Sequence, residues 1–316
     1  MQKIKKIIAN TPEISVILAL ALIMTVTAIA NSNFLSVGNM TALLKSIPFI
    51  ALATLGCSLC LNCGVLDISI GRVAGLCGMV FGYILDATGS LIAALACGIG
   101  CGLLFGFINA FLSINVGVDS FIVTMGTLYV AGGLRYMINS GDPITLPESY
   151  RNFSQATPLG ISWFFWIVLA IFVIVGFMQK KTVFGRRLYA CGSNAEVAKL
   201  QGVNVNLIRF ISFLICGLFA GMAGVMATID INSSQPASGT GWAFKAIAAC
   251  VIGGASLSGG KGRSFGVALG VFVVFIINNI INMMDISNYY SNVFTGCVLA
   301  GAVLVDIIRS KKKIRA

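Results

Sequence analysis

The sequence predicts an all-α fold: a polytopic helical membrane protein with about ten transmembrane helices. Of the 316 residues, 58% are hydrophobic and 10% are charged, whereas a soluble domain carries about 25% charged residues. The apolar residues gather in runs near the roughly 20 residues that a helix needs to cross a bilayer. No polar stretch is long enough for a soluble domain, so residues 1–316 are expected to form a single transmembrane domain.

The apolar runs give the expected helices, and polar or charged residues separate them. The loops on the outer side are expected to begin at Asn31, Asp86, Asn139, Asp230 and Asp285. In chain order the helices are expected at Ile14–Ala30, Leu43–Cys63, Val73–Ala87, Leu91–Ser113, Phe121–Ile138, Gly160–Met178, Leu207–Ile229, Ala246–Leu257, Phe265–Met284 and Asn292–Ile308.

The basic residues indicate the orientation of the chain, because lysine and arginine favour the cytoplasmic side of a membrane protein. With ten crossings and both termini in the cytoplasm, most basic residues fall in cytoplasmic segments. These residues are Lys3, Lys5, Lys6, Arg72, Lys180, Lys181, Arg186, Arg187, Lys199, Arg209, Lys261, Arg263, Arg309, Lys311, Lys312, Lys313 and Arg315. The net charge of +11 is therefore a consequence of topology and does not indicate binding to nucleic acid.

Two expected helices, Val73–Ala87 and Ala246–Leu257, are too short to cross a bilayer and are rich in glycine and alanine. They occupy corresponding positions if the chain divides into five helices plus five. Because five is odd, the halves would form an inverted repeat, in which paired short or broken helices mark a transport pathway near the bilayer midplane. The alternative is that neighbouring helices bury the ends of two short helices.

A long polar, basic segment interrupts the apolar runs between Thr182 and Asn206. Ser193 or Asn194 can cap a short helix there, Glu196 falls in its first turn, and Gly202 ends it. A capped helix in a cytoplasmic loop offers a soluble partner a place to bind. The alternative is an ordinary basic loop that fixes topology.

Several polar side chains lie inside or beside the apolar runs. Asp67 and Ser69 precede the third helix, where the carboxylate either caps free N–H groups or contacts a solute. Asn278, Asn279 and Asn282 lie on the ninth helix, where amides either line a polar pore or bond to neighbouring helices.

Two apparent motifs carry no chemistry. Cys57, Cys60 and Cys63 have the CxxCxxC spacing of cluster ligands, but the fourth cysteine is absent and the run is apolar, so they are expected to pack helices. The segment from Ala255 to Ser264 resembles a phosphate loop without its first glycine and its final Ser or Thr. We therefore expect no metal, no cofactor and no ATP hydrolysis by this chain.

Three stretches resemble the membrane permease subunits of bacterial ABC importers of the ribose/xylose/galactose type. They are Ser233–Gly270, Gly185–Val205 and Gly64–Leu76, of which the first is the longest and most specific. Weaker similarity covers residues 120–134 and 277–290. The resemblance extends from about Asn39 to the C-terminus.

The resemblance implies a subunit of the bacterial inner membrane that dimerises, as a homodimer or with a related permease. It receives sugar from an extracytoplasmic binding protein, and a cytoplasmic ABC ATPase drives it. Residues 180–206 become the loop that couples to this ATPase. The residues expected to carry the coupling are Arg186, Gly192, Asn194, Glu196, Ala198 and Gly202.

The sequence departs from the family pattern near the expected path. Lys245 stands where an acidic residue is usual, Arg72 replaces a serine, Gly132 an arginine, Asp119 a proline and Val65 a glycine. Related permeases carry other pentoses, hexoses, nucleosides or autoinducer-2, so the substrate stays open among these.

Two other classes of protein fit the residues less well. An ion-coupled secondary transporter needs acids or histidine within the membrane, and an enzyme needs a catalytic cluster; the chain has no histidine. A sugar path needs small residues and neutral hydrogen-bonding groups. The residues expected to line it are Ser69, Thr124, Gly239, Gly241, Asn278 and Asn279, while Asp67 and Gly71 are expected to hold the broken segment before the third helix.

Overall fold

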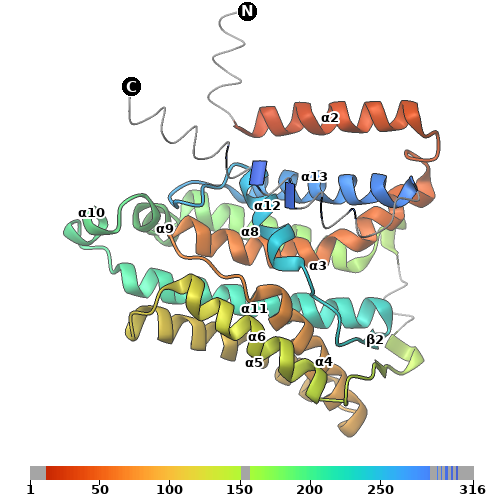
Figure 1. The fold of residues 1–316 in the computed structure, drawn as a ribbon, viewed down its shortest axis with the longest axis horizontal. Coiled ribbons are helices and arrows are strands. Elements are labelled where there is room, and N and C mark those ends of the chain that lie inside the picture. Colours follow the sequence, from red (N-terminus) through yellow and green to blue (C-terminus); the bar gives the residue numbers. More distant parts are fainter. Residues whose placement is uncertain are drawn as a thin grey trace, which may run out of the picture.

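The computed structural model describes residues 12–150 and 157–284, together with isolated positions between 290 and 304. Most of this part of the chain is helical, as Figure 1 shows. Seven of its helices are long and apolar enough to cross a membrane. The predicted all-α, polytopic fold is therefore confirmed.

The elements follow the predicted order along the chain. The longer helices are α2 (Pro12–Ala30), α3 (Val37–Asn62), α4 (Ile70–Thr88), α5 (Leu91–Ala110), α6 (Ser120–Met137), α8 (Trp163–Lys181), α9 (Val183–Ser193), α11 (Val205–Ile231), α12 (Trp242–Ile252) and α13 (Ser264–Met283). The short elements are η1 (Phe111–Asn115), β1 (Ile144–Thr145), η2 (Pro158–Gly160), α10 (Ala195–Leu200) and β2 (Ser233–Ser234).

The structure corrects one of the two predicted short helices. The prediction that Val73–Ala87 is too short to cross the membrane is wrong, because α4 begins at Ile70 and its 19 residues suffice. α12 is short as predicted, with 11 residues, although it begins at Trp242 rather than Ala246. The tenth expected helix, Asn292–Ile308, lies outside the continuously described residues.

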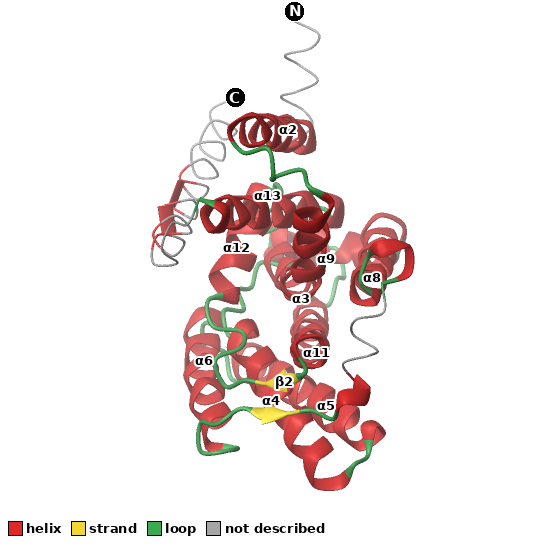
Figure 2. Ribbon diagram, turned by 90° about the vertical axis from the view of Figure 1, so that its right-hand side faces the viewer, coloured by secondary structure: helices red, strands yellow, loops and turns green. Residues whose placement is uncertain are grey.

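α3 and α11 form the centre of the fold and pack against each other. Their approach is close, because a Cβ atom on Gly56 would lie 3.1 Å from the Cα atom of Cys216. α11 also packs against α4 and α5, whereas α3 packs against α12 and α13, and Figure 2 shows these two groups on opposite sides of the central pair. An inverted repeat would produce this exchange of partners, and the five-plus-five division stays a prediction because the tenth expected helix lies outside the continuously described residues.

The connecting segments gather at two ends of the molecule. At one end, left in Figure 1, lie α9, α10 and the loop before α13, where the Gly260 amide donates to the Asn62 carbonyl at 3.1 Å. At the other end β1 pairs antiparallel with β2, and Ile144 lies opposite Ser234. Segments expected in the cytoplasm meet at the first end and outer loops meet at the second, as alternating crossings require.

α2 lies along one side of the molecule, where it packs against α13 (Figure 1). Its apolar side chains are largely uncovered, and Leu22, Val26 and Ile29 are exposed. Such a surface suits lipid acyl chains or a second chain. At the start of α2, Glu13 lies 3.4 Å from Arg263, which ties this helix to the loop before α13.

Candidate functional site: the coupling segment and the solute path

The predicted capped helix in the polar segment is present as α10. The Asn194 side chain accepts hydrogen bonds from the amides of Glu196 and Val197, both at 3.0 Å. At the other end Gly202 has a φ of 78° and its amide donates to Lys199 at 2.9 Å. Asn194, rather than Ser193, is therefore the cap, and Gly202 ends the turn as expected.

The sequence analysis of the polar segment does not predict α9. Gly192, although it is a turn-forming residue, is helical here, and Thr182 caps α9 by accepting from the Gly185 amide at 3.2 Å. Leu188 and Cys191 are buried, so α9 packs against α3, α8 and α11. A threonine followed by apolar residues at helical spacing is the signal that could have revealed it.

α10 projects from the end of the molecule where α9 and the loop before α13 lie (Figure 1). Ala198 is buried and attaches the helix to its neighbours, whereas Leu200 is 88% exposed and Val197 is exposed as well. Glu196 and Lys199 flank them on the surface, as do Arg186 and Arg187 of α9. A small apolar surface surrounded by charges is typical of a docking site for a soluble protein.

The segment between α3 and α4 is held by a buried polar network. The Asp67 carboxylate accepts from the Ser69 amide at 2.8 Å and from the Ser69 hydroxyl at 2.6 Å. The Asn109 amide on α5 donates to Ser69 Oγ at 3.0 Å, and the Thr127 hydroxyl on α6 donates to Asn109 Oδ1 at 2.7 Å. Asp67 therefore joins the broken segment to two further helices, and sequence reasoning missed Asn109 and Thr127.

Two residues predicted to line the path have hydroxyl groups that are hydrogen-bonded to other protein groups. The Ser69 side chain is buried within the network around Asp67. Thr124 is likewise buried, and its hydroxyl donates to the Ser120 carbonyl of its own helix at 2.8 Å. In this conformation the hydroxyls of Ser69 and Thr124 contact protein groups.

The segment from Ser233 to Gly241, which is expected on the outer side, packs closely against α4. A Cβ atom on Gly75 would collide with the Ser238 carbonyl, and one on Gly239 would collide with the carbonyl of Gly71. Gly239 and Gly241 both have a φ of 78°, which glycine adopts at little cost. The loop therefore approaches α4 closely, and Gly71 is one of its contact points.

Arg135 on α6 anchors the same segment. Its side chain is buried and donates to the Ser238 carbonyl at 2.7 Å and to the Thr240 hydroxyl at 2.9 Å. Nearby, the guanidinium group of Arg72 lies 5.1 Å from the centre of the Tyr129 ring and fills the space beside Gly132. An arginine inside an apolar helix is the signal for this site, because such a residue is costly in a membrane unless it is bonded.

The asparagines of α13 form contacts within and between helices. The amides of Asn279 and Asn39 on α3 bond reciprocally, at 2.8 Å and 3.0 Å. Asn278 donates to the Val274 carbonyl of its own helix at 2.7 Å. For Asn279, bonding to a neighbouring helix is the alternative that the structure shows.

The cysteines of the CxxCxxC run lie within the helix packing. Cys57, Cys60 and Cys63 are buried, and the Cys60 thiol faces the Ser212 carbonyl of α11 at 3.5 Å. Within the described part of the chain, no three His, Cys, Asp or Glu side chains are placed to hold a metal ion.

Comparison with known proteins identifies the family. Residues 39–303 match the family described as "Branched-chain amino acid transport system / permease component". The chain belongs to this permease family. It is therefore a transport component rather than an enzyme, and it resides in the cytoplasmic membrane. Membership also implies a separate ATPase and a substrate-binding protein as partners of the permease.

Relatives of the permease match it over most of their length. The ribose import permease protein RbsC of Escherichia coli (strain K12) is 30% identical over 92% of each chain, and its counterpart in Haemophilus influenzae is 30% identical over 94% of each. The autoinducer 2 import system permease protein LsrC of Escherichia coli (strain K12 / DH10B) is 31% identical over 95% of this chain and 88% of its own. No solved structure matches the permease.

Proposed function

We propose that the permease moves a monosaccharide, of which a ribose-like pentose is the first candidate, from an external binding protein into the cytoplasm. The exposed α10 helix carries this proposal, because a capped helix with Leu200 on its surface is suited to docking on an ATPase. The similarity to ribose import permeases supports a sugar as the solute.

Autoinducer-2 is the second candidate solute. This chain is 31% identical to an autoinducer-2 import permease and 30% identical to the ribose import permease of Escherichia coli. The two sequence identities therefore support the two solutes equally. A nucleoside is a weaker alternative, and ion-coupled transport is weaker still.

The proposed path runs beside the inward segment from Ser233 to Gly241. Asn278 and Asn279 would offer neutral amides to sugar hydroxyls when their bonds to Val274 and Asn39 open, and the glycines at 239 and 241 let the backbone come close. Ser69 and Thr124 reach the solute only when the break between α3 and α4 moves, because their hydroxyls are occupied in this conformation. Asp67 and Gly71 hold this break.

The uncovered apolar surfaces support pairing with a second permease chain. Tyr129 and Met137 on α6 are exposed, as is much of α2. We infer a homodimer or a pair with a related permease, and the remaining apolar surface would contact lipid.

Reconstitution in liposomes tests the proposed function. The permease, a partner ATPase and the binding protein are expected to accumulate radiolabelled D-ribose with ATP, and uptake should persist when the proton gradient is collapsed at constant ATP. A parallel reaction with autoinducer-2 separates the two candidate solutes. Accumulation of either solute by the permease alone under a proton or sodium gradient would place it among secondary transporters.

A further inference from the structure

Three distant segments of the chain meet at the cytoplasmic end, and each contributes glycine. They are the break after α3 at Asn62–Gly64, the last turn of α9 at Gly192, and the loop Gly259–Gly262 between α12 and α13. A Cβ atom on Gly192 would collide with the Asn62 carbonyl. A Cβ atom on Gly259 would lie 2.7 Å from the Gly192 oxygen and 3.1 Å from the Gly64 Cα. We refer to this meeting point as the glycine junction.

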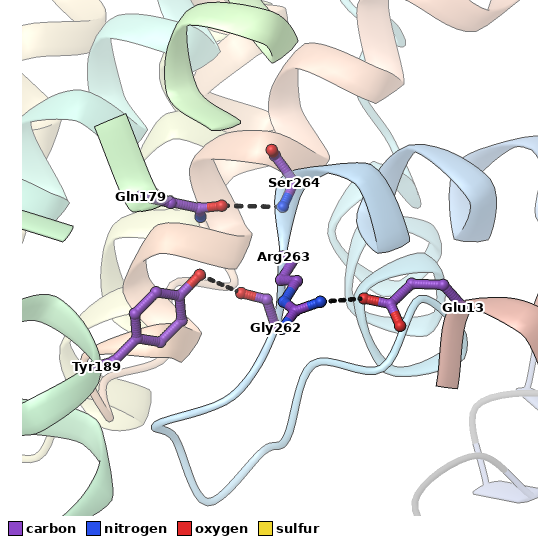
Figure 3. Close-up of polar contacts among 6 residues, drawn as sticks. All are labelled: Glu13, Gln179, Tyr189, Gly262, Arg263 and Ser264. Carbon is purple, nitrogen blue, oxygen red and sulfur yellow. Dashed lines mark hydrogen bonds and ion pairs between the residues drawn. The ribbon is translucent and has the colours of Figure 1, made fainter. Parts of the chain in front are cut away.

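Hydrogen bonds hold the glycine junction together. The Tyr189 hydroxyl of α9 donates to the Gly262 carbonyl at 2.6 Å, as Figure 3 shows. The Asn62 side chain at the end of α3 donates to the same oxygen at 3.1 Å. The Gly260 amide donates to the Asn62 carbonyl at 3.1 Å. One carbonyl, that of Gly262, thus binds both α9 and α3.

The far side of the loop is attached as well. The Ser264 amide donates to the Gln179 side chain of α8 at 2.9 Å, and Arg263 pairs with Glu13 of α2 (Figure 3). The loop Gly259–Ser264 is therefore fixed to four helices besides the two that it connects.

The closest contacts within the junction, those of Gly192 with Asn62 and of Gly259 with Gly192 and Gly64, are between backbone atoms. A contact of this kind has no flexible side chain that could absorb a displacement, because packed interiors transmit strain. α9 leads directly into α10, the loop leads into α12 and α13, and the break leads into α4. A displacement of α9 must therefore displace the loop and the break together, or separate them.

We propose that the glycine junction transmits the movement of α9 and α10 to the membrane helices, and that Tyr189 is the positioning residue that keeps α9 attached to the loop. This inference rests on the proposed function, since it assumes that an ATPase moves α10. It gives a role to the glycines of the segment Ala255–Ser264, which the sequence pattern alone leaves without one.

The variant Tyr189→Phe tests the inference in the complete transporter with its ATPase and binding protein. It removes one oxygen atom, and Asn62 still donates to the Gly262 carbonyl. Loss of one hydrogen bond is expected to lower the amount of D-ribose moved per ATP hydrolysed by about three- to tenfold. ATP hydrolysis, ATPase binding and the half-saturating D-ribose concentration should stay close to those of wild type.

Tyr83→Phe is the matched control, because Tyr83 is exposed on α4. It should leave the ratio of transport to hydrolysis unchanged. An unchanged ratio in Tyr189→Phe would overturn the inference. So would a variant that no longer binds the ATPase, since Tyr189 would then serve docking or folding. Failure of wild type to transport D-ribose with ATP would instead count against the proposed function.

A second variant keeps the test independent of one substitution. Asn62→Ala removes the other donor to the Gly262 carbonyl. If both residues act through this oxygen, their effects are not independent, because residues that share a partner are not additive. The fold-loss of transport per ATP in the double variant should then differ from the product of the fold-losses in the two single variants. Losses that multiply would show that the two residues act separately and would contradict a shared junction.

Discussion

At the level of single residues, the buried polar side chains around Asp67 are bonded to one another. The Asp67 carboxylate receives two bonds from Ser69, and Asn109 and Thr127 extend the network to α5 and α6. Within a membrane an unbonded polar group costs several kcal/mol. These side chains therefore stabilise the break before α4, and a solute must compete with their contacts.

Asn278 is the side chain for which we predict a direct effect on solute movement. Asn278→Leu should lower the maximal rate of uptake by about three- to tenfold, because one neutral hydrogen-bonding group on the path is lost. The half-saturating solute concentration should change little, since the external binding protein selects the solute. Uptake over a concentration series measures both quantities. A large loss of apparent affinity at an unchanged maximal rate would contradict the placement of Asn278 on the path.

Tyr189 gives a prediction about pH. Burial raises the pKa of Tyr189 to about 12, although the charge of Arg263 opposes the shift. The pKa of Tyr189 in the folded protein exceeds its ordinary value of about 10. The stabilisation that the protonated Tyr189 hydroxyl gives the folded state is therefore complete below about pH 10 and is lost as the pH rises toward 12.

From about pH 6 to 9 the Tyr189 phenol of the wild type is protonated in both the folded and the unfolded state. The difference in coupling between wild type and Tyr189→Phe should therefore stay constant over this range. Transport per ATP, measured at several pH values within this range, checks the prediction. A difference that shrinks as the pH rises would show that the Tyr189 hydroxyl ionises in the working protein.

At the level of elements, local signals in the sequence gave the most reliable predictions. The helix α10 could be predicted because Asn194 and Gly202 act within a few residues of it. The start of α4 at Ile70 could not, because the break before it is held by the hydrogen bond that Asn109, distant in the chain, donates to the Asp67 carboxylate. Likewise, the glycines of α4 predict only a weakened helix from the sequence alone. Their role depends on the segment from Ser233 to Gly241, which packs against them and is distant in the chain.

α10 itself is predicted to be the docking element for the ATPase. Leu200→Asp should weaken co-purification of the ATPase with the permease and lower ATP-driven uptake by about tenfold or more, because Leu200 is 88% exposed and its burial would contribute about 1.5–3 kcal/mol. The protein should still fold, since Leu200 contributes little to its own core.

Gln201→Asp is the control for α10. It adds the same charge one residue away and removes no apolar surface. Equal losses in Leu200→Asp and Gln201→Asp would show that charge, rather than the apolar side chain, is responsible. Full ATPase binding in Leu200→Asp would remove α10 from the docking surface.

At the level of the whole molecule, the packing links two halves that share almost no recognisable sequence. α11 contacts α4 and α5, and α3 contacts α12 and α13. Helix boundaries follow from hydropathy, but this exchange depends on close contacts such as that of Gly217 with Gly102, which are distant in the chain. The glycines that permit such contacts are visible in the sequence, whereas their partners are not.

The arrangement of the loops predicts the topology of the chain. Single cysteines can be introduced in a background where the exposed Cys97 and Cys297 are replaced by serine. A membrane-impermeant maleimide should label Ser90→Cys in intact cells, because Ser90 lies between α4 and α5 at the outer end. Gln201→Cys, beside α10, should react only after the membrane is permeabilised.

The side of the membrane on which the C-terminus lies decides whether the number of crossings is even or odd. Ser310 lies outside the described residues, and ten crossings place it in the cytoplasm with the basic residues that follow it. Ser310→Cys should therefore behave like Gln201→Cys and react only in permeabilised cells. Labelling of Ser310→Cys in intact cells would require an odd number of crossings. The two halves could then not be complete five-helix inverted repeats, and the paired contacts of α3 and α11 would need another explanation.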